Sequence, residues 1–152
     1  MANTYSQINI HCVFAVKGRK YQLTKDIRPQ LFKYLYGILK NDEAYPLAVN
    51  GWKDHVHVFF ELAPKMSIAD HMMKLKSSSS KWLNDHFFEN REFKWQEGYG
   101  AFSYSKSQRS SVINYIENQE IHHQSVSFKE EYINFLNKYD VDFDQRYLFD
   151  FY

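Results

Sequence analysis

Two histidines separated by a single valine have the clearest potential for chemistry in this sequence. His55 and His57 flank Val56 in a segment with the alternating pattern of a β-strand. Residues two apart on a strand point to the same face, so both imidazole rings project together. Two rings placed in this way can chelate one divalent metal, each through one ring nitrogen. The alternative is a coincidental pair on a solvated sheet face, since the chain contains 7 histidines.

A tyrosine and a glutamine form a second pair further along the chain. Tyr115 and Gln119 have the i, i+4 spacing that places two side chains on one side of a helix, about a turn apart. The phenol can then reach a substrate while the amide oxygen helps to hold a metal. The alternative is structural, because semi-buried tyrosines are common on amphipathic helices and the chain has 12 tyrosines.

The elements that position these residues follow from hydrophobic periodicity and from capping residues. The predicted strands are 8–16, 45–52, 55–62 and 93–104, and the predicted helices are 27–38, 67–86, 108–122 and 127–136. Thr24, Ser67 and Ser127 are the expected caps of three helices. The order β-α-β-β-α-β, followed by two helices, predicts an α+β fold of the ferredoxin-like type. We expect helices on one face of an antiparallel sheet and an open second face, which suits single-stranded nucleic acid.

Length and composition limit the classes of protein to consider. With 152 residues, of which 44% are hydrophobic and 24% charged, the chain is predicted to fold as a single domain over 1–152. We expect its core over about 5–139 and an acidic, aromatic tail over 140–152. No apolar run approaches the ~20 residues that cross a bilayer, and the single cysteine, Cys12, excludes a disulfide framework. A cytoplasmic protein with no membrane partner is expected.

The charges are distributed unevenly along the chain. The net charge is only +1, but residues 1–110 carry 16 Lys and Arg against 10 Asp and Glu, whereas residues 111–152 carry 3 against 8. A basic body with an acidic tail suggests a polyanionic partner for the body. The same split also occurs on ordinary solvated surfaces.

Four segments in a fixed order resemble those of a known family. They are 52–58 with the two histidines, the Lys- and Ser-rich 75–82, the strand 95–102, and 112–119 with the Tyr-x-x-x-Gln spacing. In a β-α-β-β-α-β chain of this length they resemble the single-tyrosine transposases of bacterial insertion sequences, members of the HUH nuclease superfamily. The resemblance extends over about residues 5–139.

The resemblance implies an enzyme that cuts and rejoins single-stranded DNA and recognises hairpins at the ends of a mobile element. Tyr115 matches the nucleophile, which remains joined to the 5′ side of the break. His55, His57 and Gln119 match the ligands of a divalent metal, Mg²⁺ or Mn²⁺. With one such tyrosine per chain, two cleavages imply a homodimer, in which the subunits of this family commonly share their active sites.

Basic residues in the first turn and on the second helix are the predicted DNA-phosphate contacts. They are Lys17, Arg19, Lys20, Lys74, Lys76 and Lys81. Exposed aromatic residues such as Tyr99 or Phe102 are predicted to stack on unpaired bases. Three other functions stay open: a non-catalytic binding module, a domesticated relative that acts on genomic repeats, and a metallohydrolase that uses water.

Overall fold

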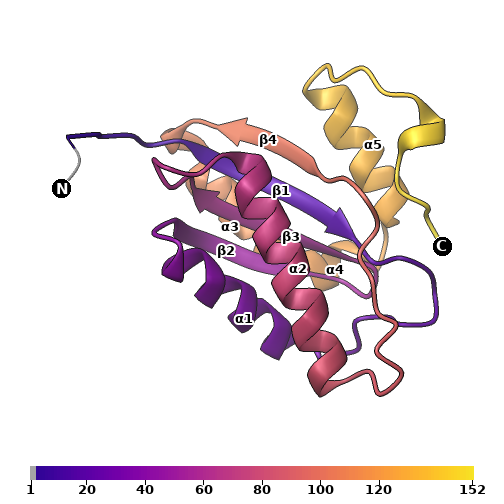
Figure 1. The fold of residues 1–152 in the computed structure, drawn as a ribbon. Helices are drawn as coiled ribbons and strands as arrows, with labels where there is room; N and C mark the ends of the chain where they lie inside the picture. Colours follow the sequence, from indigo (N-terminus) through magenta and orange to yellow (C-terminus); the bar gives the residue numbers. More distant parts are fainter. Residues whose placement is uncertain (1–2) are drawn as a thin grey trace.

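A four-stranded antiparallel sheet forms the centre of the computed structural model, which describes residues 3–152 (Figure 1). Its strands are β1 (Asn9–Ala15), β2 (Tyr45–Gly51), β3 (His55–Glu61) and β4 (Gly100–Tyr104), in the order β2-β3-β1-β4 across the sheet. Helices connect β1 to β2 and β3 to β4. This arrangement is ferredoxin-like, so the predicted fold class is confirmed.

Two helices, α1 (Arg28–Asn41) and α2 (Ile68–His86), cover one face of the sheet (Figure 1). Alternate residues of β1 and β3, among them Phe14, Val56 and Val58, are fully buried against them. Because side chains alternate along a strand, this packing sends His55 and His57 to the opposite face. The predicted orientation of the histidine pair is therefore confirmed.

The start of α2 follows the sequence prediction, whereas the start of α1 differs. Ser67 accepts a hydrogen bond from the Asp70 backbone N–H, and the Asp70 carboxylate accepts one from the Ser67 N–H, which is a complete capping box. In α1, Thr24 does not act as the N-cap. Its carbonyl accepts from the backbone N–H groups of Ile27 and Arg28 in a turn, and the helix begins at Arg28.

The second face of the sheet is covered, so the expectation of an open face is wrong. The covering helices are α3 (Arg109–Glu117), which follows the short 3₁₀ helix η1 (Lys106–Gln108), α4 (Gln119–His122) and α5 (Phe128–Lys138). Figure 1 shows α3 and α4 on the side of the sheet opposite α1 and α2. The physical reason is a second apolar stripe on the strands, which includes Val13, Phe59 and Phe102. Phe102 is only 4% exposed, so its predicted stacking on bases is wrong as well.

The predicted helix over 108–122 is interrupted at Asn118. Its backbone, with φ −99° and ψ 22°, separates α3 from α4. The Asn118 side chain donates to the carbonyl of Asn114 at 2.8 Å. Local bonds of this kind from an Asn side chain to the backbone often compete with the continuation of a helix. Tyr115 therefore lies on α3 and Gln119 on α4, although both still face the sheet.

The C-terminal tail packs on its own chain through aromatic residues. It contains the 3₁₀ helix η2 (Gln145–Tyr147). The Phe149 ring lies 4.9 Å from that of Tyr132 on α5. Gln96 exchanges two hydrogen bonds with the backbone of Asp150. None of the helices within residues 3–152 is long and apolar enough to span a membrane.

Candidate active site

The two histidines of β3 lie fully buried under α4 and α5, and a glycine sets the start of their strand. A Cβ atom added to Gly51 would lie 2.2 Å from the carbonyl oxygen of His55. That oxygen accepts the Trp52 backbone N–H at 3.0 Å, which closes the turn between β2 and β3. Only glycine permits this approach, so Gly51 helps to fix the position of His55.

Each of the two imidazoles has an outer hydrogen-bond partner. His55 Nδ1 lies 2.7 Å from Oδ1 of Asp54, and His57 Nδ1 lies 2.7 Å from Nε2 of His11 on β1. With Nδ1 engaged, each ring turns its Nε2 atom toward the helices. This is the usual arrangement of metal-binding histidines, whose second nitrogen is held by an outer partner.

Gln119 brings its side chain to the same place. Its Oε1 atom lies 3.1 Å from Nε2 of His55 and 2.9 Å from Nε2 of His123, and its Nε2 atom donates to Glu131 at 2.9 Å. His123 in turn donates from Nδ1 to the Val126 carbonyl at 2.7 Å. The structure thus places three of the predicted residues, His55, His57 and Gln119, around one point.

A carboxylate that the sequence reasoning missed lies at the centre of the cluster. Glu131 on α5 is only 3% exposed, and its Oε1 atom is 3.1 Å from Nε2 of both His55 and His57. A signal was present: Glu131 follows Phe128 by three residues and precedes Phe135 by four, so it lies on the apolar face of its helix. A charged residue on such a face is an indication of a buried ionic site.

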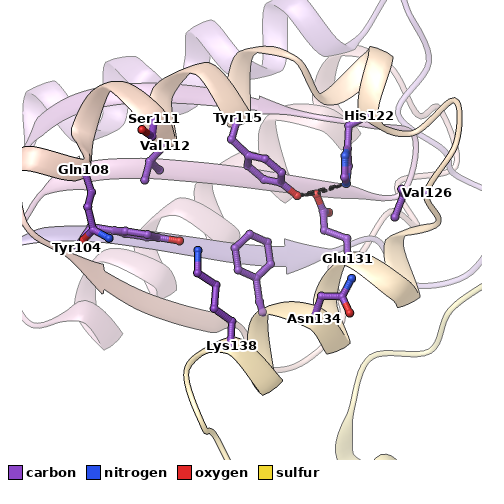
Figure 2. Close-up of a pocket in the computed structure, with 11 residues that line it drawn as sticks. Tyr104, Gln108, Ser111, Val112, Tyr115, His122, Val126, Glu131, Asn134 and Lys138 are labelled. Carbon is purple, nitrogen blue, oxygen red and sulfur yellow. Dashed lines mark hydrogen bonds and ion pairs between the residues drawn. The ribbon is translucent and has the colours of Figure 1, made fainter.

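Tyr115, the predicted nucleophile, lies beside this carboxylate (Figure 2). Its hydroxyl donates to Oε2 of Glu131 and lies 3.3 Å from Nε2 of His122. The phenol borders a groove of about 410 Å³ between α3 and α5. Gln108 and Ser111 line the groove on one side, and residues of α5 line the other. The groove connects the tyrosine hydroxyl with solvent.

The electrostatics of the cluster favour the charged forms of Glu131 and His55 at its centre and the neutral form of Tyr115 beside them. Burial raises the pKa of Glu131 on its own, but His57 and hydrogen bonds from the surrounding imidazoles lower it far below its usual range. Burial opposes a charge on His55, yet its bonds to Asp54 and Glu131 raise its pKa to about 9. Burial and the Glu131 carboxylate raise the pKa of Tyr115, so its phenol stays protonated at neutral pH.

The donor set fits a divalent cation. Asp54 and the Val126 carbonyl accept the Nδ1 protons of His55 and His123, so in the neutral forms that metal binding requires both rings have bare Nε2 atoms. Those two atoms then face the Oε1 atoms of Gln119 and Glu131 at 2.9–3.3 Å. Acceptors at such distances repel unless a proton or a metal lies among them. His55, His57 and Glu131 offer ligand atoms within 4.8 Å of one another, and so do His122, His123 and Glu131.

The six predicted DNA contacts lie in two separate places. The turn with Lys17, Arg19 and Lys20 is exposed and leaves β1 beside His55, which pairs with Ala15. The α2 lysines lie on the other side of the sheet. There Lys74 pairs with Asp42, Lys81 pairs with Asp85, and Lys76 donates to the carbonyls of Gln96 and Gly98 at 2.7 and 2.8 Å. Contact of these residues with DNA stays a prediction.

Comparison with known families identifies the family to which the chain belongs. The family described as "Transposase IS200 like" matches residues 4–119. The chain belongs to the IS200-like transposase family. The resemblance seen in the sequence is thereby confirmed, and this transposase is an enzyme of the single-tyrosine HUH class. Such enzymes use a divalent metal, which agrees with the histidine and glutamate cluster.

Individual relatives agree with this assignment. The transposase is 30% identical over 125 residues to the transposase of insertion sequence element IS200 from Salmonella typhimurium, which covers 78% of this chain and 81% of that protein. It is 24% identical over 118 residues to the ISDra2 transposase TnpA of Deinococcus radiodurans. This match covers 74% of this chain and 84% of that protein.

Two solved structures share the fold. A candidate transposase from Deinococcus radiodurans R1 superposes with a TM-score of 0.62 at 22% identity, over 78% of this chain and 95% of that one. A REP-associated tyrosine transposase bound to a REP hairpin superposes with a TM-score of 0.59 at 13% identity, over 83% of this chain and 74% of that one. The family match ends at residue 119, so α5 and the tail lie beyond it.

Proposed function

We propose that this transposase cuts and rejoins single-stranded DNA through a 5′-phosphotyrosine bond at Tyr115. One observation carries the proposal: the Tyr115 hydroxyl faces a groove open to solvent and contacts the same carboxylate as His55 and His57. The phenol loses its proton as its oxygen attacks the phosphorus, and the bond from the phosphorus to the 3′ oxygen breaks. The 3′ oxygen takes up a proton, so the released strand ends in a 3′ hydroxyl. The phosphotyrosine keeps the bond energy, and attack by a second 3′ hydroxyl releases Tyr115 and rejoins the DNA.

His55, His57 and Gln119 hold Mg²⁺ or Mn²⁺ beside the groove in this proposal. When bound, the metal neutralises charge on the scissile phosphate and stabilises the transition state. Two imidazoles and oxygen ligands suit Mn²⁺, whereas Mg²⁺ prefers oxygen alone. The protein itself orients the reactants, because Asp54 and His11 fix the two rings and α3 fixes the phenol.

The substrate is single-stranded DNA next to a hairpin at the end of an element. A structural relative binds a REP hairpin, and the near-neutral net charge of +1 favours recognition by a local basic surface. Lys17, Arg19 and Lys20 provide such a surface at the end of the sheet that carries His55. Excision and insertion need two cleavages, so the active unit is a homodimer with two Tyr115 side chains, acting in the cytoplasm.

A covalent-capture experiment tests the chemistry. The purified protein is incubated with Mn²⁺ and labelled single strands from both flanks of its own gene, and then denatured. We expect a protein–DNA adduct that disappears with a chelator and with Tyr115→Phe, and that persists in the control Tyr36→Phe, since Tyr36 lies exposed on α1. An adduct that persists in Tyr115→Phe would refute the assignment of the nucleophile. Tight binding without any adduct would indicate a binding module.

A further inference from the structure

We propose that Glu131, supplied by α5, is an anionic ligand of the metal that His55 and His57 hold. This inference rests on the proposed function, since it takes the metal site of β3 as its starting point. It adds a residue that lies 12 positions beyond Gln119 and outside the segment that matches the transposase family. The coordination sphere of this chain would therefore differ from the His-His-Gln set that the sequence predicts.

The position of the carboxylate is that of a ligand. Its Oε1 atom is 3.1 Å from Nε2 of His55 and of His57, and 3.3 Å from Nε2 of His123. Within residues 3–152, every ion pair of Glu131 is with a histidine. A buried carboxylate is costly unless it is paired or binds a metal. A divalent cation among these atoms compensates the charge fully.

Chemical preference supports the same assignment. Imidazole nitrogens and an amide oxygen are all neutral, so His55, His57 and Gln119 alone leave the full charge of the ion uncompensated. Carboxylate oxygens are the favoured ligands of both Mg²⁺ and Mn²⁺. Oε1 of Glu131 faces the two β3 histidines, while Oε2 accepts from Tyr115 and Gln119. One carboxylate thus links the metal ligands to the nucleophile.

The start of α5 is held firmly enough to present a ligand. Ser127 caps the helix by accepting the Glu130 backbone N–H at 3.2 Å. The Phe128 ring stacks on that of His55 with centroids 3.9 Å apart and an angle of 3° between the planes. Further along, a Cβ atom added to Gly100 of β4 would lie 2.8 Å from the Tyr132 side chain. These contacts fix Glu131 over β3 without a metal.

Direct measurement of Mn²⁺ binding without DNA tests the inference. The free ion is counted by electron paramagnetic resonance in titrations of the full-length protein and of three variants: Glu131→Gln, Glu130→Gln and His57→Ala. Loss of a mere outer-shell partner weakens metal binding about 10–100-fold, so we expect at least about a tenfold loss for Glu131→Gln. Glu130 is the matched control, since it is the adjacent, exposed carboxylate of the same helix, and Glu130→Gln should bind normally.

The outcomes separate this inference from the proposed function. Unchanged affinity in Glu131→Gln, with affinity lost in His57→Ala, overturns the role of Glu131 and keeps the β3 metal site. Tighter Mn²⁺ binding by Glu131→Gln also overturns the inference, because it would show that the carboxylate hinders metal binding. Unchanged affinity in His57→Ala refutes the β3 site itself.

A measurement on the unaltered protein covers the case in which Glu131→Gln fails to fold. Amide hydrogen exchange of α5 is compared with and without Mg²⁺. If Glu131 binds the metal, the ion ties α5 to β3, and exchange over Phe128–Lys138 slows as binding saturates. If Mg²⁺ binds elsewhere in the chain and leaves amide exchange over Phe128–Lys138 unchanged, the inference is overturned.

Discussion

His11 and His57 face each other across β1 and β3, with Nε2 of His11 2.7 Å from Nδ1 of His57. For His57 to bind a metal through Nε2, its Nδ1 atom must carry the proton, and His11 must accept it. Burial and the neighbouring His57 hold the pKa of His11 well below its usual value, so it is neutral and able to accept. His11 therefore positions His57 without touching the ion.

Replacement of His11 measures the value of this contact. In His11→Leu, the His57 ring loses the acceptor that fixes its proton, so Mn²⁺ affinity should fall about 10–100-fold. His11→Gln retains an acceptor and should recover part of the loss. The control is His71→Leu, which removes an equally buried histidine that packs on Phe60 on the other face of the sheet. If both leucine variants bind the metal normally, His11 has no positioning role.

The contrast between His57 and Glu131 shows what the sequence can predict. The orientation of His55 and His57 needs only the alternation of a strand, so local sequence suffices. Glu131 lies 74 residues from His57, and only the packing of α5 on the sheet joins them. Its helix is predictable from Ser127, but the covered second face is not, because the apolar stripe of Val13, Phe59 and Phe102 is assembled from three different strands. The break at Asn118 accompanies a local side-chain bond to the Asn114 carbonyl, which hydrophobic periodicity does not reveal.

Gly51 should be indispensable for the site although it contacts no substrate. In Gly51→Ala, the added methyl group meets the His55 carbonyl at 2.2 Å, so the turn must shift and carry His55 with it. We expect a loss of about 1–3 kcal/mol in the free energy of unfolding, typical of overpacking, together with weaker Mn²⁺ binding. Chemical denaturation and the Mn²⁺ titration measure the two effects.

The matched control for that change is Gly37→Ala. Gly37 lies inside α1, and a Cβ atom there has no neighbour within 4 Å among the described residues 3–152. The substitution should stabilise the protein by about 0.4–1 kcal/mol, because alanine restricts the unfolded chain. Equal effects of the two substitutions would show that the approach of Gly51 to His55 is unimportant.

Two lysines of α2 should respond differently to removal. Lys76 Nζ donates to two carbonyls, and Lys76→Met leaves both without this partner, so unfolding free energy should fall by about 1–3 kcal/mol. Lys81 is exposed, and its one ion pair within residues 3–152 is with Asp85, so Lys81→Met should cost about 0–1 kcal/mol. If Lys81 contacts DNA, its removal lowers the salt slope of binding by about 0.7 for single strands. An unchanged slope would remove Lys81 from the DNA interface.

Complementation determines whether two subunits share their active sites. Tyr115 and His57 contact the same Glu131 carboxylate within one chain, so each subunit should work with its own tyrosine. Tyr115→Phe and His57→Ala chains carrying different tags are co-expressed, and mixed assemblies are isolated through both tags. We expect no covalent adduct from them. If α3 and α4 are exchanged between subunits, one site of each mixed dimer contains both intact residues, and the adduct returns on the His57→Ala chain. That result would show that the nucleophile acts on the partner's metal site.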